Sequence, residues 1–180
     1  FTATEAAQGL KFLSMAGFNA EEAMKALPAT LDLAQAGTID LARAADISSN
    51  IMSAFGVDAS NTTGVVNDMV TTVNNANTDV QQLGDAMKYV GAAAAAAGIP
   101  IPNVASAIGV LSNAGMQGAM AGTGLRQVFI RLTNVTGAAE EALLGMGLTL
   151  DKVNPQSVGL TTAITRLREA GMTGAEAITI

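Results

Sequence analysis

Two pairs of adjacent carboxylates, Glu21 with Glu22 and Glu140 with Glu141, are the first candidates for acid–base chemistry in this sequence. The two carboxyl groups of a glycosidase must flank the scissile bond of the substrate. Adjacent residues of a helix point about 100° apart and do not face one another in this way. Glu21 and Glu22 also fall in the first turn of an expected helix, where the helix dipole favours negative charge. We therefore interpret both pairs as helix-capping or solvated residues.

A glycine-rich run, residues 115–124, is a candidate for a phosphate-binding loop. A P-loop requires a preceding strand and a final Gly-Lys-Ser or Gly-Lys-Thr, and a dinucleotide site requires a βαβ unit. The run has neither setting. We interpret it as a joint between two helices whose backbones approach closely, and we expect no cofactor.

The remaining charged residues are scattered. Arg126 and Arg131 lie on different faces of one expected helix, where their stems cover its apolar side; a contact with phosphate or a partner carboxylate is the alternative. Asp58 and Asp79 are expected to cap helix starts, and Asp151 fits no metal-loop spacing. Four lysines are expected to be solvated, namely Lys11, Lys25, Lys88 and Lys152. Without a basic cluster, and with a net charge of −6, we expect no specific nucleic-acid binding.

The composition excludes several catalytic classes, because the 180 residues include no His and no Cys. Ser-His-Asp and Cys-His nucleophiles, disulfides and the usual zinc sites are therefore ruled out. We expect no catalytic, cofactor-binding or metal-binding residues and no enzyme activity. The longest apolar run, residues 90–99, is too short for a membrane span. Residues 1–180 are interpreted as a single helical segment of a longer chain, since Phe1 is no initiator Met.

Apolar residues recur every three or four positions along most of the chain, which predicts an all-α fold. Pro28 is expected to divide one helical stretch and Gly37 to close it. Residues 99–102 are expected to form an extended link, and residues 148–153 a short extended segment. The expected helices cover residues 3–16, 20–27, 28–36, 40–55, 61–76, 79–97, 101–114, 118–135, 138–146 and 158–170, with a further helix from about 174.

Five helix ends share one design, in which glycine is followed at once by an apolar residue. The pattern Leu-x-x-Ala-Gly-(Phe or Met) predicts a Schellman motif, with the glycine left-handed and the outer apolar pair in contact. The pattern occurs at Gly17, Gly115 and Gly171, and the ends at Gly56 and Gly147 keep the same offsets with other residues. Because the left-handed conformation favours glycine, Gly17→Val or Gly115→Val is expected to cost more stability than Gly84→Val inside a helix.

Capping-box spacings predict helix starts after Thr2, Asn19, Thr78 and Thr173. Together with the glycine ends they predict tight αα-hairpin turns and a compact multi-helix domain. The joints are too sparse to define a solenoid period. The nine methionines are expected mainly to fill the core, with an adaptable partner surface as the alternative.

Seven segments occur in a familiar order, and two of them are the most specific: residues 105–116 (ASAIGVLSNAGM) and 121–132 (AGTGLRQVFIRL). The others are residues 13–24, 27–34, 40–47, 50–56 and 83–90. In these segments the chain resembles the core region of phage tail tape measure proteins over essentially its whole length. It departs from the family at Gly124, where Ala is usual.

This resemblance implies a structural role in tail assembly. Such proteins set tail length inside the tail tube and leave it during DNA ejection. The implied partners are the tail tube protein and tail assembly chaperones, with self-association in the tail lumen. The implied location is the virion tail, and the host cytoplasm during assembly. The resemblance carries over no catalytic residue.

Two alternatives remain open from the sequence. One is an α-helical module that binds a protein partner in a Met/Ala-rich groove without catalysis. The other is an enzyme such as a cell-wall hydrolase, which a peptidoglycan-clearing assay would reveal.

Overall fold

The fold is all-α, as the periodicity predicts. In a computed structural model that describes residues 2–171, the chain is 79 % helical, with no strand in that range. The helices are α1 (Ala3–Met15), α2 (Ala20–Gly37), α3 (Leu41–Phe55), η1 (Ala59–Asn61), α4 (Thr62–Asn75), α5 (Val80–Ala96), α6 (Ile101–Asn113), α7 (Gly118–Thr133), α8 (Ala138–Gly145), α9 (Leu150–Val153), α10 (Pro155–Val158) and α11 (Leu160–Glu169).

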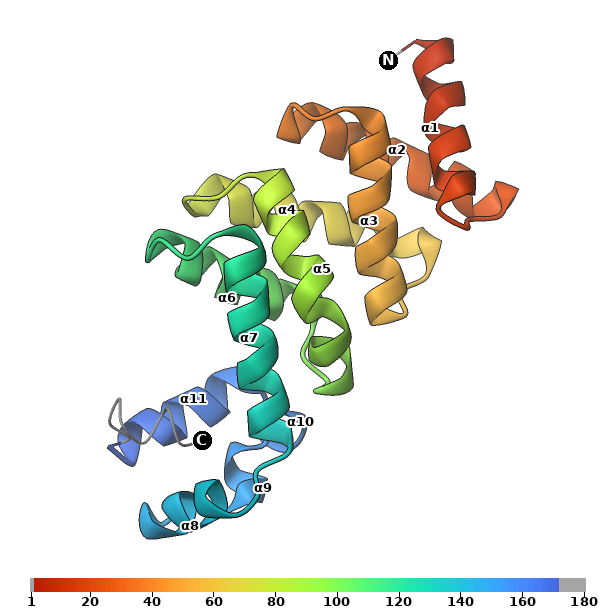
Figure 1. Cartoon of the computed structure of the whole chain (residues 1–180). Coiled ribbons are helices and arrows are strands. Elements are labelled where there is room, and N and C mark those ends of the chain that lie inside the picture. The colour runs from red at the N-terminus through yellow and green to blue at the C-terminus, as the bar shows by residue number, and fades with distance from the viewer. Residues whose placement is uncertain (1, 172–180) are drawn as a thin grey trace.

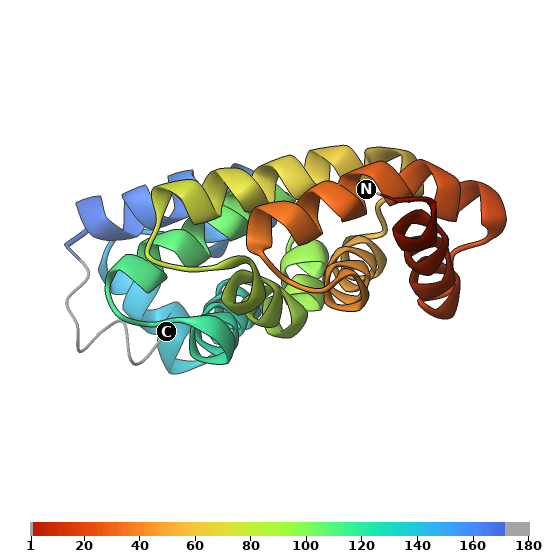
Figure 2. The ribbon, with the colours of Figure 1, turned by 90° about the horizontal axis from the view of Figure 1, so that it is seen from above.

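The long helices form two rows. Helices α1, α3, α5 and α7 lie side by side in one row (Figure 1). Helices α2, α4 and α6 form a second row across it, and α11 lies beyond α6 (Figure 2). In both rows a helix packs mainly against the second helix before it along the chain. This arrangement is that of a stacked repeat, in which each unit contacts chiefly its neighbours.

The stack has a period of about 39 residues, which the predicted joints were too sparse to define. Helices α3, α5 and α7 begin at Leu41, Val80 and Gly118, which are 39 and 38 residues apart. The fifth residue of each of these helices is small, namely Ala45, Gly84 and Gly122. The helix ends recur with a similar period, since Gly17, Gly56 and Gly98 follow α1, α3 and α5 at intervals of 39 and 42 residues. The period was not apparent from the predicted joints because Gly98 was not among them.

Two of these small residues allow neighbouring helices to approach closely. A Cβ atom on Gly84 would lie 2.8 Å from Cγ1 of Ile47 in α3. A Cβ atom on Gly122 would lie 2.2 Å from the carbonyl oxygen of Ala86 in α5. Ile47 and Ala86 are each the seventh residue of their helix, so the two crossings have the same register. Gly84 is thus a packing position, and the expectation that it tolerates valine better than Gly17 or Gly115 loses its basis.

The predicted Schellman ends are present wherever the structure describes them. At each, the residue after the glycine donates its N–H to the carbonyl five residues earlier. These bonds join Phe18 to Leu13 (3.1 Å), Val57 to Met52 (2.9 Å), Met116 to Leu111 (2.9 Å) and Leu148 to Leu143 (2.9 Å). The fifth, at Gly171, would involve residue 172, which lies outside the described residues. A further end joins Ile99 to Ala94 (2.9 Å). The expected extended link is confined to Ile99 and Pro100, where Pro100 is extended, and α6 begins at Ile101 as expected.

Helix α2 is continuous, so the prediction of a break at Pro28 is wrong. A proline inside a helix frees the carbonyl four residues earlier. Here that carbonyl belongs to Met24, and both Pro28 and Met24 are exposed. The freed acceptor thus lies on the exposed side of the helix, while the opposite side of α2 stays buried through Ala26 and Ala29.

The end of α2 lies one residue later than expected. Gly37 is its last helical residue, and Thr38 takes the left-handed conformation with φ 49°. The N–H of Ile39 donates to the carbonyl of Ala34 at 3.0 Å, which completes a Schellman end with threonine in the usual glycine position. Gly37 is needed instead for close approach, because its Cβ atom would lie 2.8 Å from Cβ of Val80.

The predicted capping boxes have mixed outcomes. The capping boxes at Thr2 and Asn19 are confirmed. Thr78 does not cap α5, because the side chain of Asp79 accepts the N–H of Gln82 at 2.7 Å. The capping box expected at residue 173 and the helix expected from 174 lie outside the described residues.

The extended segment expected near 148–153 is also wrong, because α9 occupies residues 150–153. Leu148 and Val153 are buried on the same small cluster. Their spacing of five brings them together across a single helical turn, so the apparent alternation of the sequence does not mark a strand.

Three apolar clusters hold the described residues together. The largest connects α2 through α7, includes Leu33, Met69 and Phe129, and reaches α11 through Leu160. A second, around Leu13, joins α1 to α2 and α3. The third, around Leu143, joins the end of α7 to α8, α9 and α11.

Candidate functional site

The two carboxylate pairs are not brought together. In the first pair, Glu21 forms an ion pair with Lys25 at 2.7 Å, and Glu22 accepts the N–H of Asn19 at 2.8 Å. The hydrogen bond from Lys25 holds the pKa of Glu21 below its usual value. Glu140 and Glu141 are exposed in the first turn of α8. The interpretation of both pairs as capping or solvated residues is confirmed.

The other charged candidates lie apart on the surface. Arg126 and Arg131 are exposed on α7. Asp58 caps the turn η1, where its carboxylate accepts the N–H of Ser60 at 2.8 Å. A hydrogen bond from Thr149 lowers the pKa of Asp151. Within residues 2–171, no group of three or more carboxylates comes close enough together to hold a metal ion.

The glycine-rich run 115–124 forms a helix–loop–helix joint, as predicted. Gly115 ends α6 in the left-handed conformation, with φ 88°. Gly122 gives the close backbone approach of α7 to α5. Gly124 has no such contact, since its Cβ atom would meet only Cε of Met116 at 3.6 Å.

The methionines divide between the core and the surface. Met52, Met69 and Met87 are buried, as the core interpretation predicts. Met15, Met24 and Met120 are largely exposed, but they stand on three different helices. They do not define one Met-rich groove.

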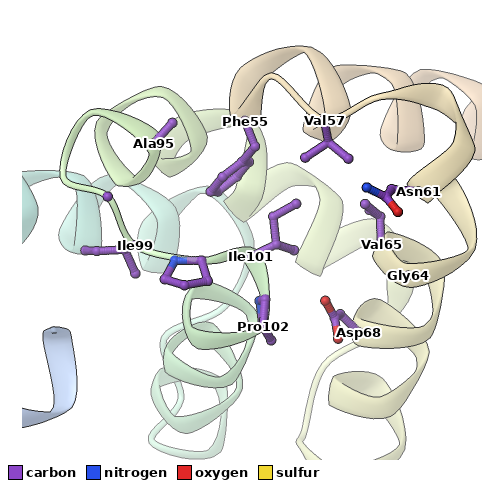
Figure 3. Close-up of a pocket in the computed structure, with 12 residues that line it drawn as sticks. Phe55, Val57, Asn61, Gly64, Val65, Asp68, Ala95, Ile99, Ile101 and Pro102 are labelled. Atoms are coloured by element: carbon purple, nitrogen blue, oxygen red, sulfur yellow. The ribbon is translucent and has the colours of Figure 1, made fainter.

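A groove of about 450 Å³ is the best candidate site in the described structure, and we call it the joint groove. It lies where the α3–α4 joint meets the α5–α6 joint, with α4 along one side (Figure 3). Phe55 and Val57 come from the end of α3, and Ile99 and Pro102 border the α5–α6 joint. The helix ends at Gly56 and Gly98 fix these two joints.

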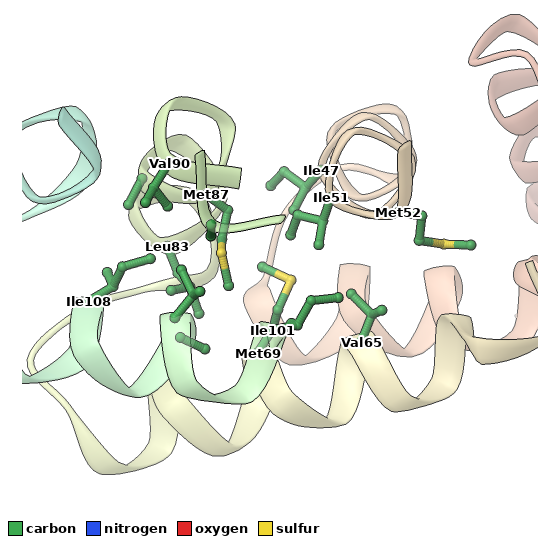
Figure 4. Close-up of a cluster of buried hydrophobic side chains, with 14 of the residues drawn as sticks. Ile47, Ile51, Met52, Val65, Met69, Leu83, Met87, Val90, Ile101 and Ile108 are labelled. Carbon is green, nitrogen blue, oxygen red and sulfur yellow. The ribbon is translucent and has the colours of Figure 1, made fainter. Parts of the chain in front are cut away.

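The floor of the joint groove belongs to the main core. Ile99, Ile101 and Val65 line the groove and are also members of the largest apolar cluster. Figure 4 shows Val65 and Ile101 beside Met69 in that cluster. Because these side chains are fixed by packing in the core, the groove is a preformed feature of the fold.

One side of the joint groove carries polar groups. Asn61, Gly64 and Asp68 follow one another along the start of α4. Figure 3 shows the Asp68 carboxylate facing Pro102 across the groove. Partial burial raises the pKa of Asp68. No other described residue forms a hydrogen bond or an ion pair with its carboxylate.

Sequence reasoning missed the joint groove and one ion-pair network. The groove combines three segments that are far apart in sequence, and no sequence motif marks Asp68 as a binding residue. The network centres on Arg43, which donates to Asp46 at 2.9 Å and also pairs with Asp85 of α5. Arg43 thereby links α3 to α5 at the same crossing as Gly84.

Comparisons with known proteins point to one kind of assembly. A family model described as "Phage-related minor tail protein" matches residues 1–180. The chain is 32 % identical over 170 residues to the tape measure protein of Pneumococcus phage Dp-1, covering 94 % of this chain and 15 % of that protein. It is 31 % identical over 147 residues to the probable tape measure protein of Escherichia phage P2, covering 82 % of this chain and 18 % of that protein.

The chain therefore spans less than a fifth of either relative. No solved structure matches it. Between residues 2 and 171, no helix has the length and hydropathy that crossing a membrane requires.

Proposed function

Because the chain belongs to the phage-related minor tail protein family, in which it matches tape measure proteins, we propose that it is a single helical segment of a tape measure protein. In this role it helps to set tail length inside the tail tube and takes part in DNA ejection. The observation that carries the proposal is the 32 % identity over 94 % of the chain to a protein of that name. That the chain is part of a structural protein of a phage tail, without the role in length setting or ejection, follows from family membership itself.

The proposed location is the lumen of the tail tube in the virion, and the host cytoplasm during assembly. The proposed partners are the tail tube protein, tail assembly chaperones and further copies of the same protein. The net charge of −6 supports a place beside DNA without specific binding, because like charges repel. Tight DNA retention in a filter-binding measurement would contradict this part of the proposal.

We propose further that this segment has no catalytic role. The carboxylate pairs are engaged in a cap and an ion pair or exposed at a helix start, and the chain has no His or Cys to serve as a nucleophile or its base. Clearing of peptidoglycan by the isolated chain, lost on Glu140→Gln, would contradict it.

The test of length setting is a deletion matched to the repeat. Removing residues 80–117 from the parent gene takes out one 38-residue unit and joins Asp79 directly to α7, which begins at the position equivalent to α5. If the segment is extended as a helix along the tube, tails shorten by about 57 Å at 1.5 Å per residue. The measurement is tail length in electron micrographs of assembled particles.

Two controls accompany the deletion. Duplicating the same unit is expected to lengthen tails by the same amount. Gly124→Ala, which changes no packing contact, is expected to leave tail length unchanged. Normal tails of unchanged length after the deletion would contradict the proposal.

A further inference from the structure

We propose that the joint groove binds a basic peptide segment, one that presents a large apolar side chain next to a Lys or Arg. The apolar side chain would enter between Phe55 and Pro102, and the cation would pair with Asp68. This binding site is independent of whether the chain sets tail length.

The apolar part of the argument rests on the shape of the groove. Its floor residues Val65 and Ile101 are fixed in the core, so they do not move up to fill the space. Phe55 and Val57 are only partly buried, although both pack against that core. A preformed apolar concavity with few polar groups is the usual form of a ligand site. An apolar side chain would remove this exposed surface from water.

The charge part of the argument rests on Asp68. It is the only charged residue of α4 and the only one among the groove residues. Burial already disfavours its charged form, and no described cation compensates it. A cation supplied by a ligand would pair with a partly desolvated carboxylate, where the attraction is stronger than in bulk water. An anionic ligand would meet repulsion from Asp68 and from a chain whose net charge is −6.

The backbone of α4 leaves room for such a ligand. Gly64 lies in the helix between Asn61 and Asp68, and a Cβ atom there would meet nothing within 4 Å. Glycine inside a helix costs about 1 kcal/mol relative to alanine. No packing contact with another described residue explains this glycine, in contrast to Gly84 and Gly122. It does allow a peptide to lie close against α4.

The test uses three acetylated and amidated peptides, Ala-Phe-Arg-Ala, Ala-Phe-Gln-Ala and Ala-Phe-Glu-Ala. Each is titrated into the isotope-labelled 180-residue chain, and binding is measured from shifts of the backbone amide signals of Gly64 and Asp68. We expect the Arg peptide to bind several-fold more tightly than the Gln peptide and at least tenfold more tightly than the Glu peptide. In Asp68→Asn the advantage of Arg over Gln should disappear. In Glu141→Gln, which removes an exposed carboxylate elsewhere, it should persist.

A second variant tests the location. Gly64→Leu is expected to fill the groove and weaken all three peptides at least tenfold. Gly145→Leu, at an equally open position in α8, should bind them as the unmodified chain does. Circular dichroism checks that both variants are folded, and Asp68→Asn remains decisive if Gly64→Leu is not. The proposal is overturned if Arg and Gln peptides bind equally, if Asp68→Asn keeps the preference, or if the shifts lie outside the groove.

Discussion

Two regions of the molecule use the same helix ends but pack in different ways. From α2 to α7 the helices are 13 to 18 residues long and share one core. From α8 to α11 they are 4 to 10 residues long and gather mainly around a separate small cluster, although Leu160 of α11 belongs to the large core. Yet Gly147 ends α8 with the same backbone bonds with which Gly115 ends α6.

The difference lies in the residues at the helix crossings. The fifth residue of α5 and of α7 is glycine, and each allows the preceding helix of the row to approach. The fifth residue of α11 is Ile164, which is half exposed. A shared joint therefore turns the chain, and in the row of α3, α5 and α7 the glycine at the fifth position of α5 and α7 lets each helix pack closely on the one before it.

The largest expected effect on the free energy of unfolding comes from truncating a side chain in the large core or in the small cluster around Leu143. Phe129→Ala, in the large core, should lower the free energy of unfolding by about 4 kcal/mol, and Leu143→Ala, in the small one, by about 3 kcal/mol. We expect hydrogen exchange to show that Leu143→Ala loosens α8, α9 and the end of α11 and leaves α5 protected, because Leu143 and Leu167 belong to the small cluster and not to the large core. Equal loss of protection in α5 would mean that both regions unfold as one unit.

The next effect tests the crossing directly. Gly122→Ala should destabilise the chain by about 3 kcal/mol, because its Cβ atom would overlap the Ala86 carbonyl and the backbone there must move. Gly124→Ala, two residues along the same helix, should instead stabilise it by about 1 kcal/mol, since alanine favours the helix and meets only ordinary contact. Urea unfolding followed by circular dichroism measures both. If the two alanines had the same sign of effect, close approach at Gly122 would not explain the stack.

A smaller effect compares joints in the two regions. Thr38 is the one described residue other than glycine with positive φ. Thr38→Gly should stabilise the chain by about 1 kcal/mol, because it relieves the crowding of Cβ in the left-handed conformation. The reverse change after α8, Gly147→Thr, should lower the free energy of unfolding by a similar amount. Thermal unfolding of both variants checks whether one rule governs the joints of both regions.

The smallest effect concerns the charge of Asp68 in α4, within the region from α2 to α7. Burial raises the pKa of Asp68 in the folded chain, so its charged form costs stability above that pKa. Asp68→Asn should gain a few tenths of a kcal/mol at pH 7, a modest figure because the group is partly solvated. The gain should vanish below about pH 3.9, the ordinary value for an aspartate. Urea unfolding across that pH range tests it, and Glu141→Gln in the C-terminal region should show no such gain.

The sequence predicts the helices well because their signals are local. Apolar spacing and caps place α4 and α5 within one residue of their observed bounds. The Schellman bonds follow from residues only five apart. Pro28 is where this reasoning fails, because a strong local signal is overruled by burial on the opposite side of α2.

The packing and the candidate site were not predictable in the same way. A glycine required by backbone conformation, such as Gly115, looks the same in sequence as one required by close approach, such as Gly84. Their difference depends on the residue across the interface, here Ile47. The joint groove likewise exists only once Phe55, Asp68 and Ile99 are brought together by the stacking of successive units.

The open row of helices has a mechanical consequence. Each helix of the row is held mainly by the one two places before it, and no described contact of comparable extent joins α1 to α7. A pulling force applied at the two ends would therefore peel the row from an end, rather than break it in one event. Each step would release about 39 residues, or about 130 Å of extended chain. A molecule of this shape lengthens in many small unfolding steps under load. Stretching single molecules would show these steps as evenly spaced increments in length.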